Sequence, residues 1–164
     1  MSSQDMPDRF RNAMAPLASS VTVVTTDGAK GKAGVTVSTM CSLSLEPPSV
    51  VVCVHNMSQA LEPIVGNGHF SANVLSEDQS RVAMAFAGQI EEYRDDRFAS
   101  AEWEQLVTGA PVLKGAMAAF DCNLVDTKPF GSHVILIGEV VEVASQAVSP
   151  LVYSDRSFKK LRVA

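Results

Sequence analysis

The sequence contains few cysteines and histidines, and none of them has the spacing of a metal site. Its three cysteines are odd in number and widely separated, and two of them lie in apolar, strand-like runs, which favours buried thiols over disulfides. The three histidines show no ligand spacing either. The sequence therefore predicts no structural metal. The residues concerned are Cys41, Cys53, Cys122, His55, His69 and His133.

An excess of positive charge and a long apolar N-terminal run are also missing. The chain has 13 Lys and Arg against 18 Asp and Glu, a formal net charge of −5, which argues against a sequence-independent grip on a nucleic-acid backbone. Residues 1–14, MSSQDMPDRFRNAM, are charged and predict neither a signal peptide nor a membrane anchor. We therefore expect no nucleic-acid partner, no membrane association and a cytoplasmic location.

Motifs of nucleotide-binding and hydrolytic enzymes are absent as well. Gly28, Gly31 and Gly34 are three residues apart, so they do not form a G-x-G-x-x-G fingerprint, and the chain has no Walker loop. It has no G-x-S-x-G elbow, and no catalytic triad or carboxylate pair is visible. Any dinucleotide would therefore have to bind without a Rossmann domain.

The residues that are present predict one domain, spanning 1–164, with a mainly β fold. A chain of 164 residues that is 46% hydrophobic is long enough for one proper core. Helical patterns are short, at 8–17 and 76–88. Several strands at short spacing predict an antiparallel barrel rather than a parallel α/β sheet, and Gly138 predicts a bulge or bend. The strand-like runs lie at 21–26, 35–38, 49–54, 70–75, 116–125 and 134–143.

The stretch 34–54, GVTVSTMCSLSLEPPSVVVCV, combines two strand-like runs with a line of hydroxyl side chains. Pro47 and Pro48 separate the two runs, because proline removes ladder donors and fixes the local backbone. Serine and threonine commonly occur at strand ends without a further role, so this interpretation stays open. The alternative is a cradle for a polar, oxygen-rich ligand. The hydroxyls belong to Thr36, Ser38, Thr39, Ser42 and Ser44.

The order of residues in this stretch resembles the signature of the flavin reductase family. Further motif matches extend the resemblance over nearly the whole chain. They are F-S-A-N-V-L at 70–75, A-F-A-G at 85–88, D-R-F at 96–98 with Trp103, G-S-H at 131–133 and P-L-V-Y at 150–153. The resemblance implies an FMN-binding split β-barrel, the fold of small proteins that supply reduced flavin to two-component monooxygenases.

The resemblance also implies which residues bind the flavin. A strand edge at 36–39 meets the flavin ring, the turn at 56–59 holds the ribityl phosphate, and backbone groups at 86–88 complete the site. Gln59 and Ala60 stand where the family often has an arginine and a hydroxyl residue, so we expect modest FMN affinity. Without the resemblance, Ser58 would be interpreted as a helix N-cap. The implied flavin-binding residues are Thr36, Val37, Ser38, Thr39, Ser42, Asn56, Met57, Ser58, Gln59, Phe86, Ala87 and Gly88.

A second group of residues is implied for catalysis and nicotinamide binding. His133 takes the position of the family's G-D-H histidine, near the nicotinamide and the flavin, although a lone histidine at a strand start is otherwise more often a surface residue. Ser132 replaces the family's aspartate and removes a negative charge. Arg156 is either a surface cation or a group near the second substrate, supplied across the dimer interface at which family members place their site.

Together these residues predict an NAD(P)H:flavin oxidoreductase. Hydride transfer from the nicotinamide to flavin N5 needs stacking geometry and hydrogen-bond donors more than side-chain acids or bases. We expect FMN, with FAD as an alternative, NADH or NADPH as reductant, a homodimer, and a partner monooxygenase that receives reduced flavin by diffusion. Two alternatives stay open: a flavoprotein that reduces another acceptor such as a corrin, and a non-catalytic flavin-binding dimer.

Overall fold

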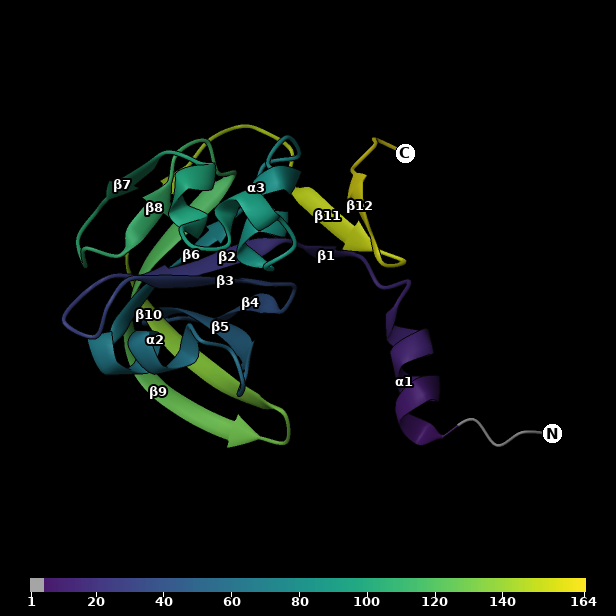
Figure 1. Cartoon of the computed structure of the whole chain (residues 1–164), viewed down its shortest axis with the longest axis horizontal. Coiled ribbons are helices and arrows are strands. Elements are labelled where there is room, and N and C mark those ends of the chain that lie inside the picture. The colour runs from purple at the N-terminus through teal and green to yellow at the C-terminus, as the bar shows by residue number, and fades with distance from the viewer. Residues whose placement is uncertain (1–4) are drawn as a thin grey trace.

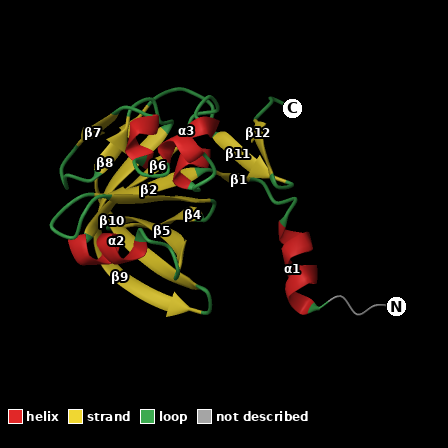
Figure 2. Ribbon diagram, in the orientation of Figure 1, coloured by secondary structure: helices red, strands yellow, loops and turns green. Residues whose placement is uncertain are grey.

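The computed structural model describes residues 5–164 as a curled sheet with short helices around it (Figure 1 and Figure 2). The helices are α1 (Met6–Met14), α2 (Leu61–Asn67) and α3 (Ser80–Phe86), with 3₁₀ turns η1 (Glu91–Tyr93) and η2 (Arg97–Ser100). The strands are β1 (Ser19–Ser20), β2 (Thr22–Thr26), β3 (Ala33–Val37), β4 (Met40–Leu45), β5 (Pro48–His55), β6 (His69–Val74), β7 (Trp103–Gln105), β8 (Pro111–Leu113), β9 (Ala118–Phe130), β10 (His133–Ser145), β11 (Leu151–Ser154) and β12 (Ser157–Lys160). Among the described residues, no helix has both the length and the apolar character needed to span a bilayer.

Seven strands form one antiparallel sheet in the order β3-β2-β6-β9-β10-β5-β4. The two edge strands of this order, β3 and β4, follow one another in the chain and are joined only by Ser38 and Thr39. The sheet must therefore curl until its edges approach. The Cys53 N–H donates to the Thr39 carbonyl at 3.3 Å, which continues the β4–β5 pairing into this two-residue connection. The prediction of a mainly β, barrel-like fold with short helices is confirmed.

Strand β2 links the two halves of the hydrophobic core. All 5 of its residues are buried, because its alternating side chains face a packed layer on each side. Val24 packs in the cluster that contains Val52 and Leu136, whereas Val23 packs in the cluster that contains Phe86 of α3. The β-branched run predicted at 21–26 is thus a strand buried on both faces.

The long β9–β10 hairpin is irregular at Gly138, as the sequence predicts. The register of the two strands shifts between Ile137 and Gly138. A Cβ at Gly138 would lie 2.5 Å from Cζ of Phe70, so only glycine lets the strand pass over this buried ring. The missing side chain allows two strands of 13 residues each to curve around the barrel.

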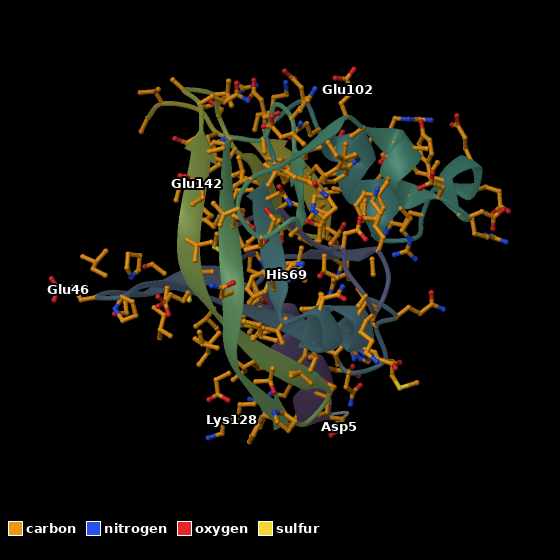
Figure 3. The ribbon with its side chains drawn as sticks, turned by 90° about the vertical axis from the view of Figure 1, so that its left-hand side faces the viewer. Asp5, Glu46, His69, Glu102, Lys128 and Glu142 are labelled. Atoms are coloured by element: carbon orange, nitrogen blue, oxygen red, sulfur yellow. The ribbon has the colours of Figure 1, made fainter. Side chains whose placement is uncertain are left out.

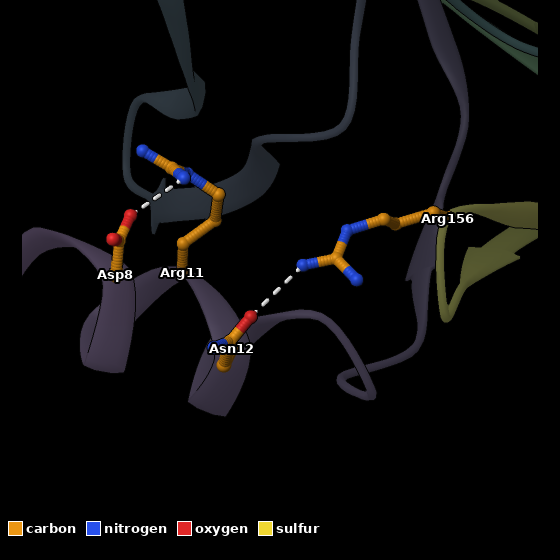
Figure 4. A network of polar contacts seen from close by, with 4 residues as sticks. All are labelled: Asp8, Arg11, Asn12 and Arg156. Atoms are coloured by element: carbon orange, nitrogen blue, oxygen red, sulfur yellow. Dashed lines mark hydrogen bonds and ion pairs between the residues drawn. The ribbon is translucent and has the colours of Figure 1, made fainter. Parts of the chain in front are cut away.

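Helix α1 stands away from the barrel, beside the β11–β12 hairpin (Figure 1). None of its residues is buried, and Phe10, in the predicted apolar stripe, is 63% exposed. Arg11 and Asp8 form an ion pair within the helix, and Arg156 Nη2 donates to Asn12 Oδ1 at 3.1 Å (Figure 4). The stripe therefore exists but covers no part of the body.

The β4–β5 hairpin also projects from the body, with Glu46 at its tip (Figure 3). Leu45 beside the tip is 86% exposed. All three cysteines are free thiols, and Cys122 is buried as expected. Cys53 is only half-buried, and Cys41, which lies outside the predicted apolar runs, is exposed on the edge strand β4. A place in an apolar run therefore does not ensure that a thiol is fully buried.

Candidate functional site

Two parts of the predicted site, the turn at 56–59 and the residues that begin β10, lie side by side. Strands β5 and β10 pair in a register that sets His133 opposite His55. The Asn56 N–H donates to the Ser132 carbonyl at 2.9 Å, which bonds the β5–α2 turn to the β9–β10 turn. Residues 55–59 and 131–133 therefore form one surface, here called the open side, in which only Ser58 is partly buried.

His133 is held on the open side by two neighbours. Its Nδ1 lies 2.8 Å from the Ser132 hydroxyl, and its ring centroid lies 5.1 Å from that of His55, with the two planes at 72°. Nδ1 of His55 accepts a hydrogen bond from the Met57 N–H at 3.1 Å. The sequence reasoning missed His55, because its place beside His133 depends on the pairing register of strands that are distant in the sequence.

The strand edge predicted to meet the flavin ring faces the end of α3. The Thr36 hydroxyl donates to the Ala83 carbonyl at 2.7 Å, so this side chain is turned to the helix rather than to a ligand. Ser38, Ala87 and Gly88 are exposed, and Gly88 has a φ of +74°, which favours glycine. A cavity of about 190 Å³ opens here, lined by predicted residues Thr36, Val37, Ser38 and Ala87 and by the aromatic pair Tyr153 and Phe158.

Phe86 is part of the core rather than of an open surface. It is fully buried, and its ring centroid lies 5.0 Å from that of Phe98 and 5.4 Å from that of Trp103. A Cβ on Gly34 of β3 would lie 2.5 Å from its ring. The Phe86 carbonyl accepts a hydrogen bond from Arg97 Nη1 at 3.0 Å. Any contact of Phe86 with a flavin is therefore limited to its backbone.

A second cavity, of about 370 Å³, lies between β3, the start of α2 and η2. Gln59 and Ala60 of the predicted phosphate turn line it together with Lys32 and Arg97. The sequence alone assigns no role to either of these cations, and Arg97 enters only as part of the D-R-F match at 96–98. Charged side chains from two separate segments, at 32 and at 94–97, meet here only in the folded chain.

A third cavity, of about 650 Å³, lies along the other side of the same turn. It is lined by Asn56, Met57, Ser58 and Gln59, with Lys30 and residues of α2. The Ser58 hydroxyl accepts from the Ala60 N–H at 3.3 Å, so it stabilises its own turn in the manner of a cap. Gln59 lines this cavity and the second one, which places the turn between them.

Seven predicted residues of the described chain line none of these three cavities: Thr39, Ser42, Phe86, Gly88, Ser132, His133 and Arg156. Thr39 and Ser42 are exposed, and Ser42 pairs with Val50 beside an irregularity of β4. Arg156 lies in the turn of the β11–β12 hairpin with a φ of +59° and bonds to Asn12 of α1 (Figure 4). Within the described chain, these residues line none of the three cavities above, and their roles stay predictions.

The titratable groups with displaced pKa values do not offer a nucleophile. Burial, together with the neighbouring Asp121 carboxylate, raises the pKa of the Cys122 thiol to about 12. Burial also raises the pKa of Cys53, and the adjacent Cys41 adds to this shift. Cys53 and Cys122 therefore stay protonated near neutral pH. Over residues 5–164, no group of three or more histidine, cysteine or acidic side chains has the geometry to hold a metal ion.

Comparison with known proteins decides the family. Residues 14–162 match the family described as flavin reductase like domain. The chain belongs to this family. It is 41% identical over 153 residues to FMN reductase (NADH) RutF 2 of Methylorubrum extorquens (strain PA1), which covers 93% of this chain and 88% of the relative.

Two solved structures place this flavin reductase-like chain in its fold. Flavin reductase PheA2 in its native state has a TM-score of 0.88 and 34% identity, covering 98% of this chain and 100% of that chain. BorF, the flavin reductase component of a bacterial two-component tryptophan halogenase, has a TM-score of 0.85 and 30% identity, covering 96% and 99%. The predictions of family, split-barrel fold and enzyme class are confirmed.

Proposed function

We propose that this chain is an NADH-dependent FMN reductase whose flavin lies between the end of α3 and the open side. The observation that carries the proposal is the bond between the Asn56 N–H and the Ser132 carbonyl, which puts the predicted phosphate turn beside the predicted nicotinamide residue His133. The 41% identity to a relative named FMN reductase (NADH) supports the choice of both cofactors.

The residues present fit a flavin. The exposed main chain at 38–39 and the glycine turn at 87–88 leave room for a flat ring to approach the backbone closely. When bound, the flavin supplies hydride acceptance at N5 and the nicotinamide supplies the hydride. The protein's contribution would be position: His133, held by Ser132 and His55, would orient the nicotinamide side, and backbone N–H groups would donate hydrogen bonds to the flavin ring.

The activity is tested with the purified chain, NADH and added FMN. We expect NADH oxidation, followed by loss of absorbance at 340 nm under anaerobic conditions, with matching bleaching of the flavin. NADPH in place of NADH measures the preference between the two reductants. NADH oxidation no faster than the enzyme-free background would contradict the proposal, and slow turnover of free FMN with tightly retained flavin would favour another electron acceptor.

We further propose that the reduced flavin diffuses to a separate oxygenase or halogenase component in the cytoplasm. BorF, which shares the fold at 30% identity, is the flavin reductase component of a two-component tryptophan halogenase, and this supports the proposal. In the test, a dialysis membrane separates one chamber with the chain, NADH and FMN from a second chamber with a flavin-dependent monooxygenase. We expect the monooxygenase to form its product although the membrane keeps the two proteins apart. Product that forms only when the two proteins are mixed directly would contradict transfer by diffusion.

A homodimer completes the proposed enzyme. Helix α1 and the β4–β5 hairpin both stand off the body with exposed apolar side chains, including Phe10 and Leu45, and a second copy of the chain would cover them. Analytical ultracentrifugation should give twice the chain mass of 17.5 kDa. Phe10→Asp should shift the sample toward monomer, whereas a monomeric wild type would rule the dimer out.

A further inference from the structure

We propose that Cys41 and Cys53 form a dithiol that hydrogen peroxide oxidises to a disulfide, and that the oxidised chain binds flavin less tightly. The oxidation does not depend on the proposed function, whereas its effect on flavin binding rests on it. Both thiols are free, and they lie on the neighbouring strands β4 and β5.

The pairing register sets the two cysteines on one face of the β4–β5 hairpin. Cys41 stands opposite Val51, and the side chains of Val51 and Cys53 share a face because they are two residues apart in one strand. The alternate positions face inward, since Met40 packs against the core cluster that contains Val52. Cys41 and Cys53 are therefore diagonal neighbours on the outer face of the sheet.

The separation of diagonal neighbours is close to the span of a disulfide. Their Cα atoms are roughly 7–8 Å apart in an antiparallel pair, and a disulfide joins Cα atoms about 4.4–6.8 Å apart. Bond formation therefore needs a movement of about 1 Å. Strand β4 can supply this movement, because it is an edge strand and its pairing with β5 is irregular between Ser42 and Ser44.

The thiols differ in exposure, which gives them different roles in the oxidation. Cys41 is exposed, so peroxide can reach it from solvent. Cys53 is half-buried, and burial, together with the nearby Cys41, raises the pKa of its thiol, which stays protonated near neutral pH. Cys41 is therefore oxidised first, and Cys53 is the thiol that reacts with the oxidised sulfur. Cys122 is fully buried in the core and is not reached.

The oxidation proceeds in two balanced steps. The Cys41 thiolate attacks one oxygen of hydrogen peroxide, which breaks the O–O bond, gives the sulfenic acid and releases hydroxide. The Cys53 sulfur then attacks the Cys41 sulfur, and the sulfenic oxygen leaves as water with the proton of the Cys53 thiol. The oxidant is a by-product of the proposed reaction, because free reduced flavin that meets dioxygen is reoxidised and yields hydrogen peroxide.

A movement of β4 reaches the main chain that the flavin ring is proposed to approach. Strand β4 begins directly after Ser38 and Thr39, and the Cys53 N–H donates to the Thr39 carbonyl at 3.3 Å. Drawing Cys41 toward Cys53 therefore displaces the exposed backbone at 38–39. Leu45, proposed to face a second copy, lies at the other end of β4, so a dimer through the hairpin tip leaves Cys41 exposed.

The oxidation is tested on the reduced, full-length chain with hydrogen peroxide and, separately, with diamide. Residues 33–80 contain neither lysine nor arginine, so trypsin leaves both cysteines in the one peptide 33–81. Mass spectrometry should show this peptide lighter by two hydrogen atoms, and dithiothreitol should reverse the change. In Cys53→Ser, dimedone should trap the sulfenic acid at Cys41. In Cys41→Ser, Cys53 should stay reduced.

Two results would overturn the dithiol. One is that both thiols in peptide 33–81 stay reduced after treatment with either oxidant. The other is that Cys41 links to Cys41 of a second copy, which a non-reducing gel would show as a covalent dimer while Cys53 remains free.

FMN affinity, measured by quenching of flavin fluorescence, tests the effect on the site. The oxidised wild type should have an FMN dissociation constant about two- to tenfold higher than the reduced protein, the range of one weakened hydrogen bond. Cys41→Ser treated with the same oxidants is the matched control and should show no shift. A complete disulfide with unchanged FMN affinity would overturn the switch. Failure of the reduced wild type to bind FMN would overturn the proposed function, and with it the switch, but not the dithiol.

Discussion

The candidate site has two sides, one made of packed aromatic side chains and the other of exposed polar side chains. On the side of α3 and η2, the rings of Phe86, Phe98 and Trp103 pack in edge-to-face contacts, and the Trp103 indole N–H donates to the Phe98 carbonyl at 2.9 Å. We call these three residues the packed side. The open side carries exposed histidines held by a few short hydrogen bonds. Both sides contain residues of family motifs in the sequence, yet the two sides have different roles.

This difference separates stability from activity. On the packed side the aromatic side chains pack into the core, so a ligand could contact only the backbone there. On the open side the backbone of the two turns is hydrogen-bonded, and the side chains of His55 and His133 stay exposed. Substitutions on the packed side should therefore lower the free energy of unfolding, and substitutions on the open side should lower activity.

Phe86→Ala should have the largest effect. Removing a fully buried ring that packs against Phe98 and Trp103 should lower the free energy of unfolding by about 3–5 kcal/mol. Urea denaturation followed by tryptophan fluorescence measures it, since Trp103 lies in the same cluster. Phe130→Ala is the control, because that ring is 81% exposed. Similar losses of unfolding free energy in Phe86→Ala and Phe130→Ala would contradict a special role of the packed side in stability.

His133→Ala should show the reverse pattern. The exposed imidazole contributes little to packing, so urea denaturation should be close to that of the wild type. Turnover with NADH should fall by about tenfold, the cost of one lost polar contact to the bound nicotinamide, while FMN affinity is largely retained. Steady-state kinetics and fluorescence quenching measure the two quantities. Equal loss of turnover and of FMN binding would mean that His133 has only a structural role.

Much of the fold could be predicted from the sequence because its signals are local. The buried run at 21–26 corresponds to β2, and the glycine at 138 corresponds to the irregularity in β10. Both features depend on the residues at those positions themselves and not on distant parts of the chain. The position of α1 could not be predicted, because an apolar stripe on a helix does not indicate which surface the helix packs against. Nor does an apolar run distinguish the half-buried Cys53 from the buried Cys122.

The candidate site was predicted only as far as its motifs reach. Motif residues such as Ser58, Ser132 and His133 lie on one surface, as the family resemblance implies. His55, Lys32 and Arg97 belong to no motif with a known role in the sequence reasoning, and they reach the site through strand register and loop packing. Long-range contacts of this kind leave no periodic trace in the sequence.

Substitutions of His55 should have smaller effects than His133→Ala, and they test separately its two contacts on the open side. His55→Asn keeps an acceptor for the Met57 N–H, and His55→Phe keeps a ring against His133. We expect the asparagine variant to retain FMN affinity and the phenylalanine variant to retain the KM for NADH, each losing about two- to fivefold in the other quantity. Identical changes in the two variants would show that the acceptor and the ring do not act separately.

Ser58→Ala should have the smallest effect and decides how the turn works. Its hydroxyl accepts from the Ala60 N–H at 3.3 Å, so its loss should loosen the turn and raise the FMN dissociation constant about two- to fivefold, as for a lost cap. Ser44→Ala is the matched control, since that hydroxyl accepts from the Glu46 N–H at 3.1 Å in the projecting hairpin. Riboflavin binding separates the two roles of Ser58: a serine that contacts the phosphate weakens FMN alone, whereas a serine that only shapes the turn weakens both flavins.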